Sequence, residues 1–372
     1  MARLGKIAIV NLALILAALI GAELIFGGWI GANYGILVLP KDFQRRFDVS
    51  GLYGHPTRTI LYRRDSHGFR GAYADPSRID LLVMGGSTTN EIFIDEAETW
   101  TAVIAQGFAQ AGRPISVVNA GVDGQSTIGN LKNFAHWLPR IPGFKARYVL
   151  FYLGINDRNV ALSGHLNKQD HLFAPRRRVK RYLLNNSALY TLFRNIRGMI
   201  RARRAKLIHD SESYDGLAWR APERPPDLAR AEARIAAFLP GYADRLARLA
   251  ARVRALGAVP IFVTQADATY RMEGGRVLGR VLADGKVDLG AYATQAVINR
   301  RTLRTCRRLG AVCIDLAGEL FFTDGDHYDD LHTTPQGSAK IGRYLYGRLS
   351  GVITPATQKT TKKSKKNPKN TR

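Results

Sequence analysis

The amino-acid sequence predicts an α/β fold in which helices cover both faces of a parallel β-sheet. Short apolar runs, typical of strands buried on both faces, recur along the chain. Between them lie segments with the helical spacing of apolar residues. The last helix is expected at 335–349, with Thr334 as its N-cap and Pro335 at its first position. This alternation indicates a parallel, doubly wound sheet.

Five apolar runs are the expected strands, at 79–84, 115–119, 148–153, 259–264 and 311–316. Further helices are expected at 96–111 and at 246–256, where Gly257 ends the apolar pattern. The stretch at 266–290 contains Gly274-Gly275 and Asp284-Gly285 turn signals and predicts a small hairpin. With 372 residues, the chain is long enough to bury a full core.

Charge is distributed unevenly along the chain. Lys and Arg number 55 against 30 Asp and Glu, a formal net charge of +25. Residues 176–206 hold eleven basic side chains and residues 359–372 hold seven, and neither stretch holds an acidic one. No nucleic-acid-binding motif accompanies this charge, so nucleic acid is not an expected partner. An anionic membrane surface or a polyanionic glycan is the partner that the charge favours.

The N-terminus is expected to be a membrane anchor. After a short basic start with Arg3 and Lys6, residues 7–22 are uncharged, and the apolar character continues past Glu23 to residue 30. A span needs about 20 apolar residues, and Glu23 is tolerable near an interface or against a partner helix. A cleaved signal peptide is the rival interpretation, although no Ala-x-Ala site closes the run. The charge pattern favours a single-pass inner-membrane protein with its body in the periplasm or cell exterior.

The chain therefore divides into an anchor at 1–40, a main domain at 41–354 and a disordered basic tail at 355–372. Within the main domain, residues 158–227 form a long basic insertion. Leu189, Leu192 and Phe193 share one side of a helix expected there. That helix is either packed on the domain with a solvated basic face or part of a lid that contacts a membrane or glycan.

Cys306 and Cys313 are the two cysteines of the chain, which excludes a disulfide scaffold and a cysteine metal cluster. Outside the cytoplasm they could pair. The alternative is two unpaired thiols, one on a helix and one on the strand that follows it.

Four short blocks contain residues suited to chemistry. Ser87 follows the first strand at a Gly-Gly turn that leads into a helix, where free N–H groups favour a nearby anion. Gly121 follows the second strand and Asn156 the third, so a bare backbone N–H and an amide donor lie at strand ends. Before the last helix, Asp329 precedes His332 by three residues and can orient its ring.

A second Asp-x-x-His segment, Asp324 to His327, competes with this pair. Asp324-Gly325 is a turn dipeptide, which explains that aspartate without catalysis. His332, in contrast, is followed directly by the start of the last helix. The sequence therefore favours Asp329 and His332.

From residue 80 to 349 the sequence resembles the SGNH hydrolases, also called GDSL esterases and lipases, on the blocks of Ser87, Gly121, Asn156 and His332. The resemblance implies a flavodoxin-like three-layer sandwich with a five-stranded parallel sheet in the order 2-1-3-4-5. It also implies a Ser87–His332–Asp329 triad and an oxyanion hole formed by the N–H groups of Ser87 and Gly121 and the amide of Asn156. No metal or cofactor is implied. The first block reads Gly-Gly-Ser-Thr instead of Gly-Asp-Ser-Leu, which leaves the substrate class open.

The expected function is a membrane-anchored serine esterase that acts on O-acyl or O-acetyl esters of a cell-envelope glycan or lipid. The alternative is an O-acyltransferase that uses the same site to modify an envelope polysaccharide, which would require exclusion of water. A third interpretation is a non-catalytic envelope-binding protein with a relict site.

Overall fold

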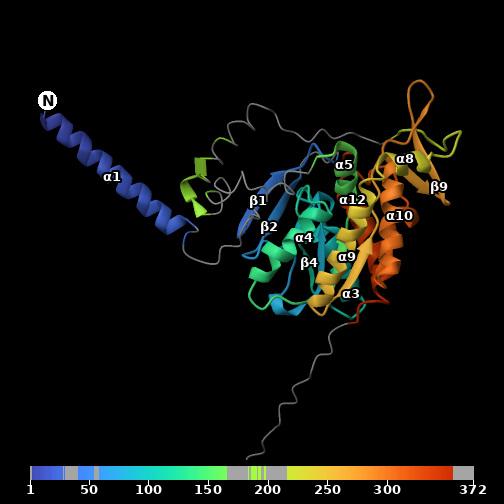
Figure 1. Ribbon diagram of the computed structural model, residues 1–372, viewed down its shortest axis with the longest axis horizontal. Helices are drawn as coiled ribbons and strands as arrows, with labels where there is room; N and C mark the ends of the chain where they lie inside the picture. Colours follow the sequence, from blue (N-terminus) through green and yellow to red (C-terminus); the bar gives the residue numbers. More distant parts are fainter. Residues whose placement is uncertain are drawn as a thin grey trace, which may run out of the picture.

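The computed structural model describes residues 2–27, 29, 41–53, 58–165, 183, 186–190, 192–193, 197 and 216–354. In it, an α/β body follows a long N-terminal helix that projects away from the body (Figure 1). The predicted tail at 355–372 and most of the basic stretch at 176–206 lie outside the described residues.

The body is built on a five-stranded parallel sheet. Its strands are β3 (Ile79–Gly85), β4 (Val117–Asn119), β5 (Ala146–Tyr152), β7 (Val259–Val263) and β11 (Val312–Ile314). They lie in the order β4-β3-β5-β7-β11, and every neighbouring pair is parallel. Numbered along the chain, this is the predicted order 2-1-3-4-5. Each predicted strand is present, with ends that differ by one or two residues.

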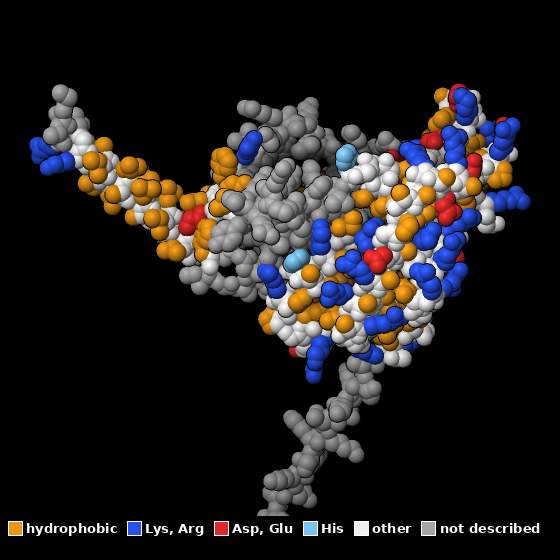
Figure 2. Space-filling model, viewed as in Figure 1, with side chains coloured by type: hydrophobic (Ala, Val, Ile, Leu, Met, Phe, Trp, Pro, Cys, Tyr) orange, Lys and Arg blue, Asp and Glu red, His pale blue; other side chains and the backbone are white. Residues whose placement is uncertain are grey.

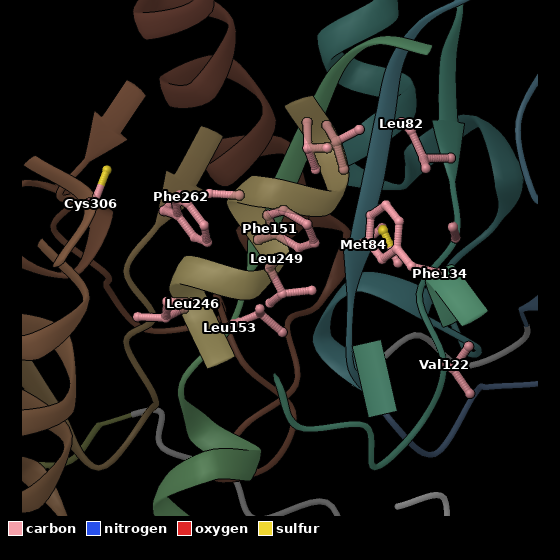
Figure 3. Packing of buried hydrophobic residues seen from close by; sticks show 14 of the residues in the cluster. Leu82, Met84, Val122, Phe134, Phe151, Leu153, Leu246, Leu249, Phe262 and Cys306 are labelled. Atoms are coloured by element: carbon pink, nitrogen blue, oxygen red, sulfur yellow. The ribbon is translucent and has the colours of Figure 1, made fainter. Parts of the chain in front are cut away.

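Helices cover both faces of this sheet, because successive side chains of a strand point to opposite faces. Leu81 and Val83 of β3 pack with α3 and α12, whereas Leu82 and Met84 pack with α4, α9 and α10 (Figure 3). The bounds of these helices are Trp100–Gln110 (α3), Thr127–His136 (α4), Leu239–Ala255 (α9), Tyr292–Arg308 (α10) and Pro335–Leu349 (α12). The predicted three-layer sandwich is confirmed.

Local capping explains where the predicted helices begin. The α12 helix has the predicted bounds, and the Thr334 hydroxyl accepts the N–H of Gly337 at 3.3 Å. The helix predicted at 96–111 is interrupted, because the Thr99 side chain caps α3 separately after the 3-10 turn η2 (Glu96–Glu98). Directly after β3 there is a shorter helix, α2 (Ser87–Asn90).

Smaller elements surround the main sheet. An antiparallel hairpin, β1 (Phe43–Asp48) with β2 (Thr59–Arg64), precedes it and was not predicted. The predicted hairpin is confirmed as β8 (Tyr270–Glu273) with β9 (Arg276–Val281), and β9 also pairs with β6 (Trp219–Arg220) and β10 (Val287–Asp288). The remaining elements are η1 (Pro76–Arg78), η3 (Leu138–Arg140), α5 (Ile155–Ser163), α8 (Leu228–Arg234) and α11 (Leu316–Glu319).

The two cysteines are paired. Cys306 near the end of α10 and Cys313 in β11 form a disulfide, with Cα atoms 5.9 Å apart. Of the two interpretations left open by the sequence, the structure supports pairing, and the bond ties a helix to the edge strand of the sheet.

The N-terminal helix α1 (Ala2–Phe26) is apolar, and many of its large hydrophobic side chains between Ile7 and Phe26 are exposed (Figure 2). Its segment Gly5–Phe26, with a hydropathy of 2.4, is long and apolar enough to cross a membrane, and a signal sequence has the same properties. Near its end, the Glu23 carboxylate accepts the N–H groups of Ala188 and Leu189 at 3.1 and 3.2 Å, as well as the Ser187 hydroxyl. The one acidic residue of the span is therefore hydrogen-bonded to another segment of the chain.

Candidate active site

Ser87 lies at the turn between β3 and α2, and two glycines make this turn possible. A Cβ atom on Gly86 would lie 2.3 Å from Nδ2 of Asn156, and one on Gly85 would lie 2.7 Å from the carbonyl oxygen of Tyr152. Both contacts are far inside van der Waals distance. Glycine at these positions allows the chain after β3 to approach the end of β5, where the strand order reverses.

His332 and Asp329 meet Ser87 from the segment that precedes α12. The His332 Nε2 atom lies 2.8 Å from Ser87 Oγ, and its Nδ1 atom lies 2.7 Å from Asp329 Oδ2. The other carboxylate oxygen of Asp329 accepts the backbone N–H groups of Leu331 and His332 at 2.8 and 2.6 Å. The structure thus brings together three residues that are separated by up to 245 positions in the sequence.

The surroundings of Asp329 keep it ionised. Burial alone would raise the pKa of its carboxyl group, but hydrogen bonds and the charge interaction with His332, together with the two backbone N–H groups, outweigh burial and lower it. On the other side of the imidazole, the Tyr328 ring stacks at 5.7 Å with an interplanar angle of 13°. The histidine is therefore held both at its Nδ1 atom and on one ring face.

Asn156 is presented by the chain after β5. Its Nδ2 atom donates to the carbonyl oxygen of Gln125 at 3.0 Å, which places the amide beside Gly86 and next to the serine turn. A residue that the sequence did not reveal stabilises this arrangement. Gln265 accepts the N–H of Ile155 at 2.8 Å and donates to the Thr88 hydroxyl at 2.9 Å, so it joins the turns after β3 and β5.

The structure does not support the predicted role of the Gly121 N–H. That group donates to Oδ1 of Asn119 at 2.9 Å and is engaged within its own loop. Gly124, three residues later, has φ +73° in a turn closed by the N–H of Gln125 on the carbonyl of Val122 at 3.1 Å. Among the described residues the N–H of Gly124 has no hydrogen-bond partner. Because two glycines follow the same strand, sequence alone could not distinguish the engaged N–H from the free one.

Two buried arginines, which were also not predicted, bind segments next to Ser87. Arg64 donates to the side-chain oxygen of Asn90 and to the carbonyl of Gly121, both at 2.6 Å. Arg70 donates to the carbonyls of Glu91 and Ile94 at 2.9 and 3.1 Å. Both come from the polar stretch before β3. Arg64 connects α2 to the loop after β4, and Arg70 binds the loop that follows α2.

The side chains of the competing Asp-x-x-His segment, Asp324 to His327, contact other residues. Asp324 forms an ion pair with Arg271 and accepts the N–H of Gly216 at 3.3 Å. His327 is buried with its ring 4.7 Å from the ring of Phe322, and burial lowers its pKa to about 4. A histidine in this environment is neutral at physiological pH. The described residues contain no cluster of three or more His, Cys, Asp or Glu side chains that could hold a metal ion.

Comparison with known proteins gives a family. The profile of the GDSL-like lipase/acylhydrolase family matches residues 83–275. No curated protein matches the chain.

Several solved structures are similar at low sequence identity. TesA has a TM-score of 0.41 at 14% identity, over 73% of this chain and 98% of TesA. The psychrotrophic esterase EstA from Pseudoalteromonas sp. has a TM-score of 0.37 at 12% identity, over 73% of this chain and 97% of EstA. Est24, a carbohydrate acetylesterase from Sinorhizobium meliloti, has a TM-score of 0.38 at 11% identity, over 74% of this chain and 99% of Est24. The matched residues 83–275, 193 of 372, are more than half of the sequence, and the chain therefore belongs to the GDSL-like lipase/acylhydrolase family of ester hydrolases.

Proposed function

We propose that this protein is a membrane-anchored serine esterase that removes acyl groups from a glycan or lipid of the cell envelope. One observation supports this type of reaction. The His332 ring lies 2.8 Å from the Ser87 hydroxyl through Nε2 and 2.7 Å from the Asp329 carboxylate through Nδ1. In this geometry an imidazole can take the hydroxyl proton, while the carboxylate orients the ring and stabilises its cationic form.

The reaction proceeds through an acyl-enzyme. Ser87 Oγ forms a bond to the ester carbonyl carbon as its proton passes to Nε2 of His332. The tetrahedral intermediate then expels the alcohol, which takes the proton from His332. Water attacks the acyl-enzyme carbonyl as it gives a proton to His332. The second tetrahedral intermediate then breaks its bond to Ser87 Oγ, which takes that proton from His332, and the carboxylic acid is released.

The negatively charged oxygen of the tetrahedral intermediate must be stabilised by hydrogen-bond donors of the protein. The Ser87 N–H and the Asn156 amide take this role in the proposal, and Gly124 replaces Gly121 as the third donor. The free N–H of Gly124 supports this choice, since the N–H of Gly121 is already bonded to Asn119. A donor of this kind contributes about 3 kcal/mol to transition-state stabilisation.

The membrane location rests on the apolar helix α1 and its basic start. In the proposal α1 stays attached, spans the inner membrane and leaves the body on the periplasmic or outer side. The hydrogen bonds from Ser187, Ala188 and Leu189 to Glu23 support an anchor that remains part of the folded protein. Leu192 and Phe193, which follow, are 55% and 61% exposed, which favours contact of the basic insertion with the lipid surface over packing on the domain.

The substrate class follows from this location and from the positive charge, which attracts polyanionic envelope polymers. An O-acetyl or other O-acyl ester on such a polymer is the proposed substrate. Transfer of the acyl group to a sugar hydroxyl would use the same acyl-enzyme and differs only in what attacks it.

The experiment is a panel of 4-nitrophenyl esters of increasing acyl length, hydrolysed by the full chain in detergent, with and without an added envelope polysaccharide. Hydrolysis that is abolished in Ser87→Ala, with an unchanged circular dichroism spectrum, supports the proposal. Acyl groups that appear on the polysaccharide in preference to water would establish the transferase instead. A protein that forms no acyl-enzyme with any ester would contradict both.

A further inference from the structure

Glu91, a buried acid, lies next to the catalytic residues but takes no part in the mechanism above. It is the residue that ends α2, four positions after Ser87, and only 5% of it is exposed. Its φ of 50° and ψ of 53° are left-handed, a conformation that side chains with a Cβ atom rarely adopt. Such a conformation persists only where the surroundings enforce it, and here hydrogen bonds to the side chain do so.

The Glu91 carboxylate joins three separate parts of the structure. One oxygen accepts the N–H of Trp100 at the start of α3, at 2.9 Å. The other accepts the hydroxyls of Thr333 at 3.2 Å and of Ser338 in α12 at 2.7 Å. Thr333 is the residue directly after His332. The helix that begins with Ser87 is thereby connected to the segment that holds His332.

We propose that Glu91 is a positioning residue for the esterase reaction, whose carboxylate holds Thr333 and so aligns His332 with Ser87. The proposal rests on the esterase function proposed above and extends it. Proton transfer between Ser87 and His332 depends on a 2.8 Å contact, and small displacements of such contacts reduce rates strongly. The Glu91 backbone N–H donates to the Ser87 carbonyl at 2.8 Å, and its carboxylate acts on the His332 segment through Thr333.

The hydrogen-bond arrangement makes this alignment depend on a proton. The Ser338 hydroxyl lies 2.7 Å from the Glu91 carboxylate and 3.0 Å from the carbonyl oxygen of Glu98, but it has one proton to donate. When Glu91 is protonated it can donate to Ser338, which then donates to Glu98. When Glu91 is ionised it is an acceptor only, and it binds the Thr333 hydroxyl through a stronger, charge-assisted bond.

The charges around Glu91 allow both states at physiological pH. Burial raises the pKa of Glu91 to about 7, against hydrogen bonds from Ser338 and Trp100 and the charge of Arg70, which lower it. Arg70 donates to the Glu91 backbone carbonyl at 2.9 Å. Among the described residues, Tyr53, Tyr152 in β5 and Tyr328 also interact with Glu91, and these tyrosines are neutral in this pH range.

The test compares kcat of wild type and Glu91→Gln for 4-nitrophenyl acetate between pH 5.5 and 8.5, using the full chain in detergent. A glutamine can reproduce the bonds of the protonated carboxyl group, because its oxygen can accept from Trp100 while its NH₂ donates to Ser338 and Thr333. We expect the ratio of wild-type to variant kcat to fall from about ten at pH 8.5 to about one at pH 5.5, with KM unchanged.

The matched control is Glu98→Gln, an acid of the same segment whose side chain pairs with Arg58. Its ratio to wild type should stay near one at every pH. If Glu91→Gln does not fold, Thr333→Val removes the bond to the catalytic segment from the other side and should give the same pH-dependent loss. A ratio that does not change with pH, or a change in KM alone, would overturn the proposal while leaving the esterase function intact. A wild-type protein without esterase activity would overturn both.

Discussion

Two Asp-x-x-His segments lie five residues apart, and they differ in what surrounds them. In the later one, the Asp329 carboxylate accepts from Nδ1 of the His332 ring, and Nε2 lies 2.8 Å from Ser87 Oγ. In the earlier one, Asp324 pairs with Arg271 instead of with its histidine. His327 is 9% exposed and packs against Phe322.

The same pair of residue types at the same spacing is therefore a hydrogen-bonded dyad in one segment and two unrelated structural residues in the other. Asp329 accepts the N–H groups of Leu331 and His332, which folds the segment so that the aspartate faces the ring. Asp324 is drawn away by an arginine from β8. Spacing permits the dyad, and the partner of the carboxylate determines whether it forms.

The largest expected effect separates the two histidines. His332→Ala removes the only base within hydrogen-bond distance of Ser87 among the described residues. We expect kcat to fall on the order of 10⁶-fold in ester hydrolysis, as for the loss of a triad base. A fall of less than about a hundredfold would show that another base serves Ser87.

Asp329→Asn should have a smaller effect. The imidazole stays in place but is no longer oriented by an ionised partner, so we expect a fall in kcat on the order of 10⁴-fold. The check is the same ester assay, with Asp324→Asn as the matched control. If the control lost as much activity as Asp329→Asn, the two segments would have been assigned in the wrong order.

His327→Gln tests whether the earlier segment has a structural role instead of a catalytic one. The His327 ring packs against Phe322, whereas His332 is the histidine that bonds to Ser87 and Asp329, so we expect kcat to change by less than about tenfold, or ~1.4 kcal/mol. The melting temperature should fall, since the ring contact with Phe322 is lost. Full loss of turnover in a variant that still folds would exclude a purely structural role for His327.

A further expected effect is on stability against pH and not on turnover. Burial lowers the pKa of His327 from 6.5 to about 4, so the unfolded chain takes up a proton at a higher pH than the folded one. The free energy of unfolding should therefore fall by roughly 3 kcal/mol as the pH drops from 6.5 to 4. His327→Gln should lack this contribution, and urea unfolding of both proteins measures the difference. The lowered pKa of Asp329 acts in a different window, because its stabilising effect is lost only below pH 3.8.

Much of the fold could be predicted from local patterns. The strands of the sheet are apolar runs, and α12 has the bounds that Thr334 and Pro335 indicate. The positions of Ser87, Asn156, Asp329 and His332 follow from where strands and helices end. These features are short-range in sequence, and physical rules for strands and caps describe them well.

The features that could not be predicted depend on contacts between distant segments. Whether Gly121 or Gly124 has a free N–H depends on where the Asn119 side chain turns. The burial of Arg64 beneath the site depends on acceptors far along the chain, such as the Gly121 carbonyl. Glu91 looks like an ordinary surface acid in the sequence, and only the fold reveals its three donors.

The most direct test of the central claim, that His332 activates Ser87, is the rate of covalent labelling by a fluorophosphonate, with the modified residue identified by mass spectrometry. The full chain should carry the adduct on Ser87, and His327→Gln should be labelled at the wild-type rate. His332→Ala should be labelled far more slowly, and Ser87→Ala not at all. An adduct on another residue, or loss of labelling in His327→Gln with retention in His332→Ala, would contradict the assignment of this site.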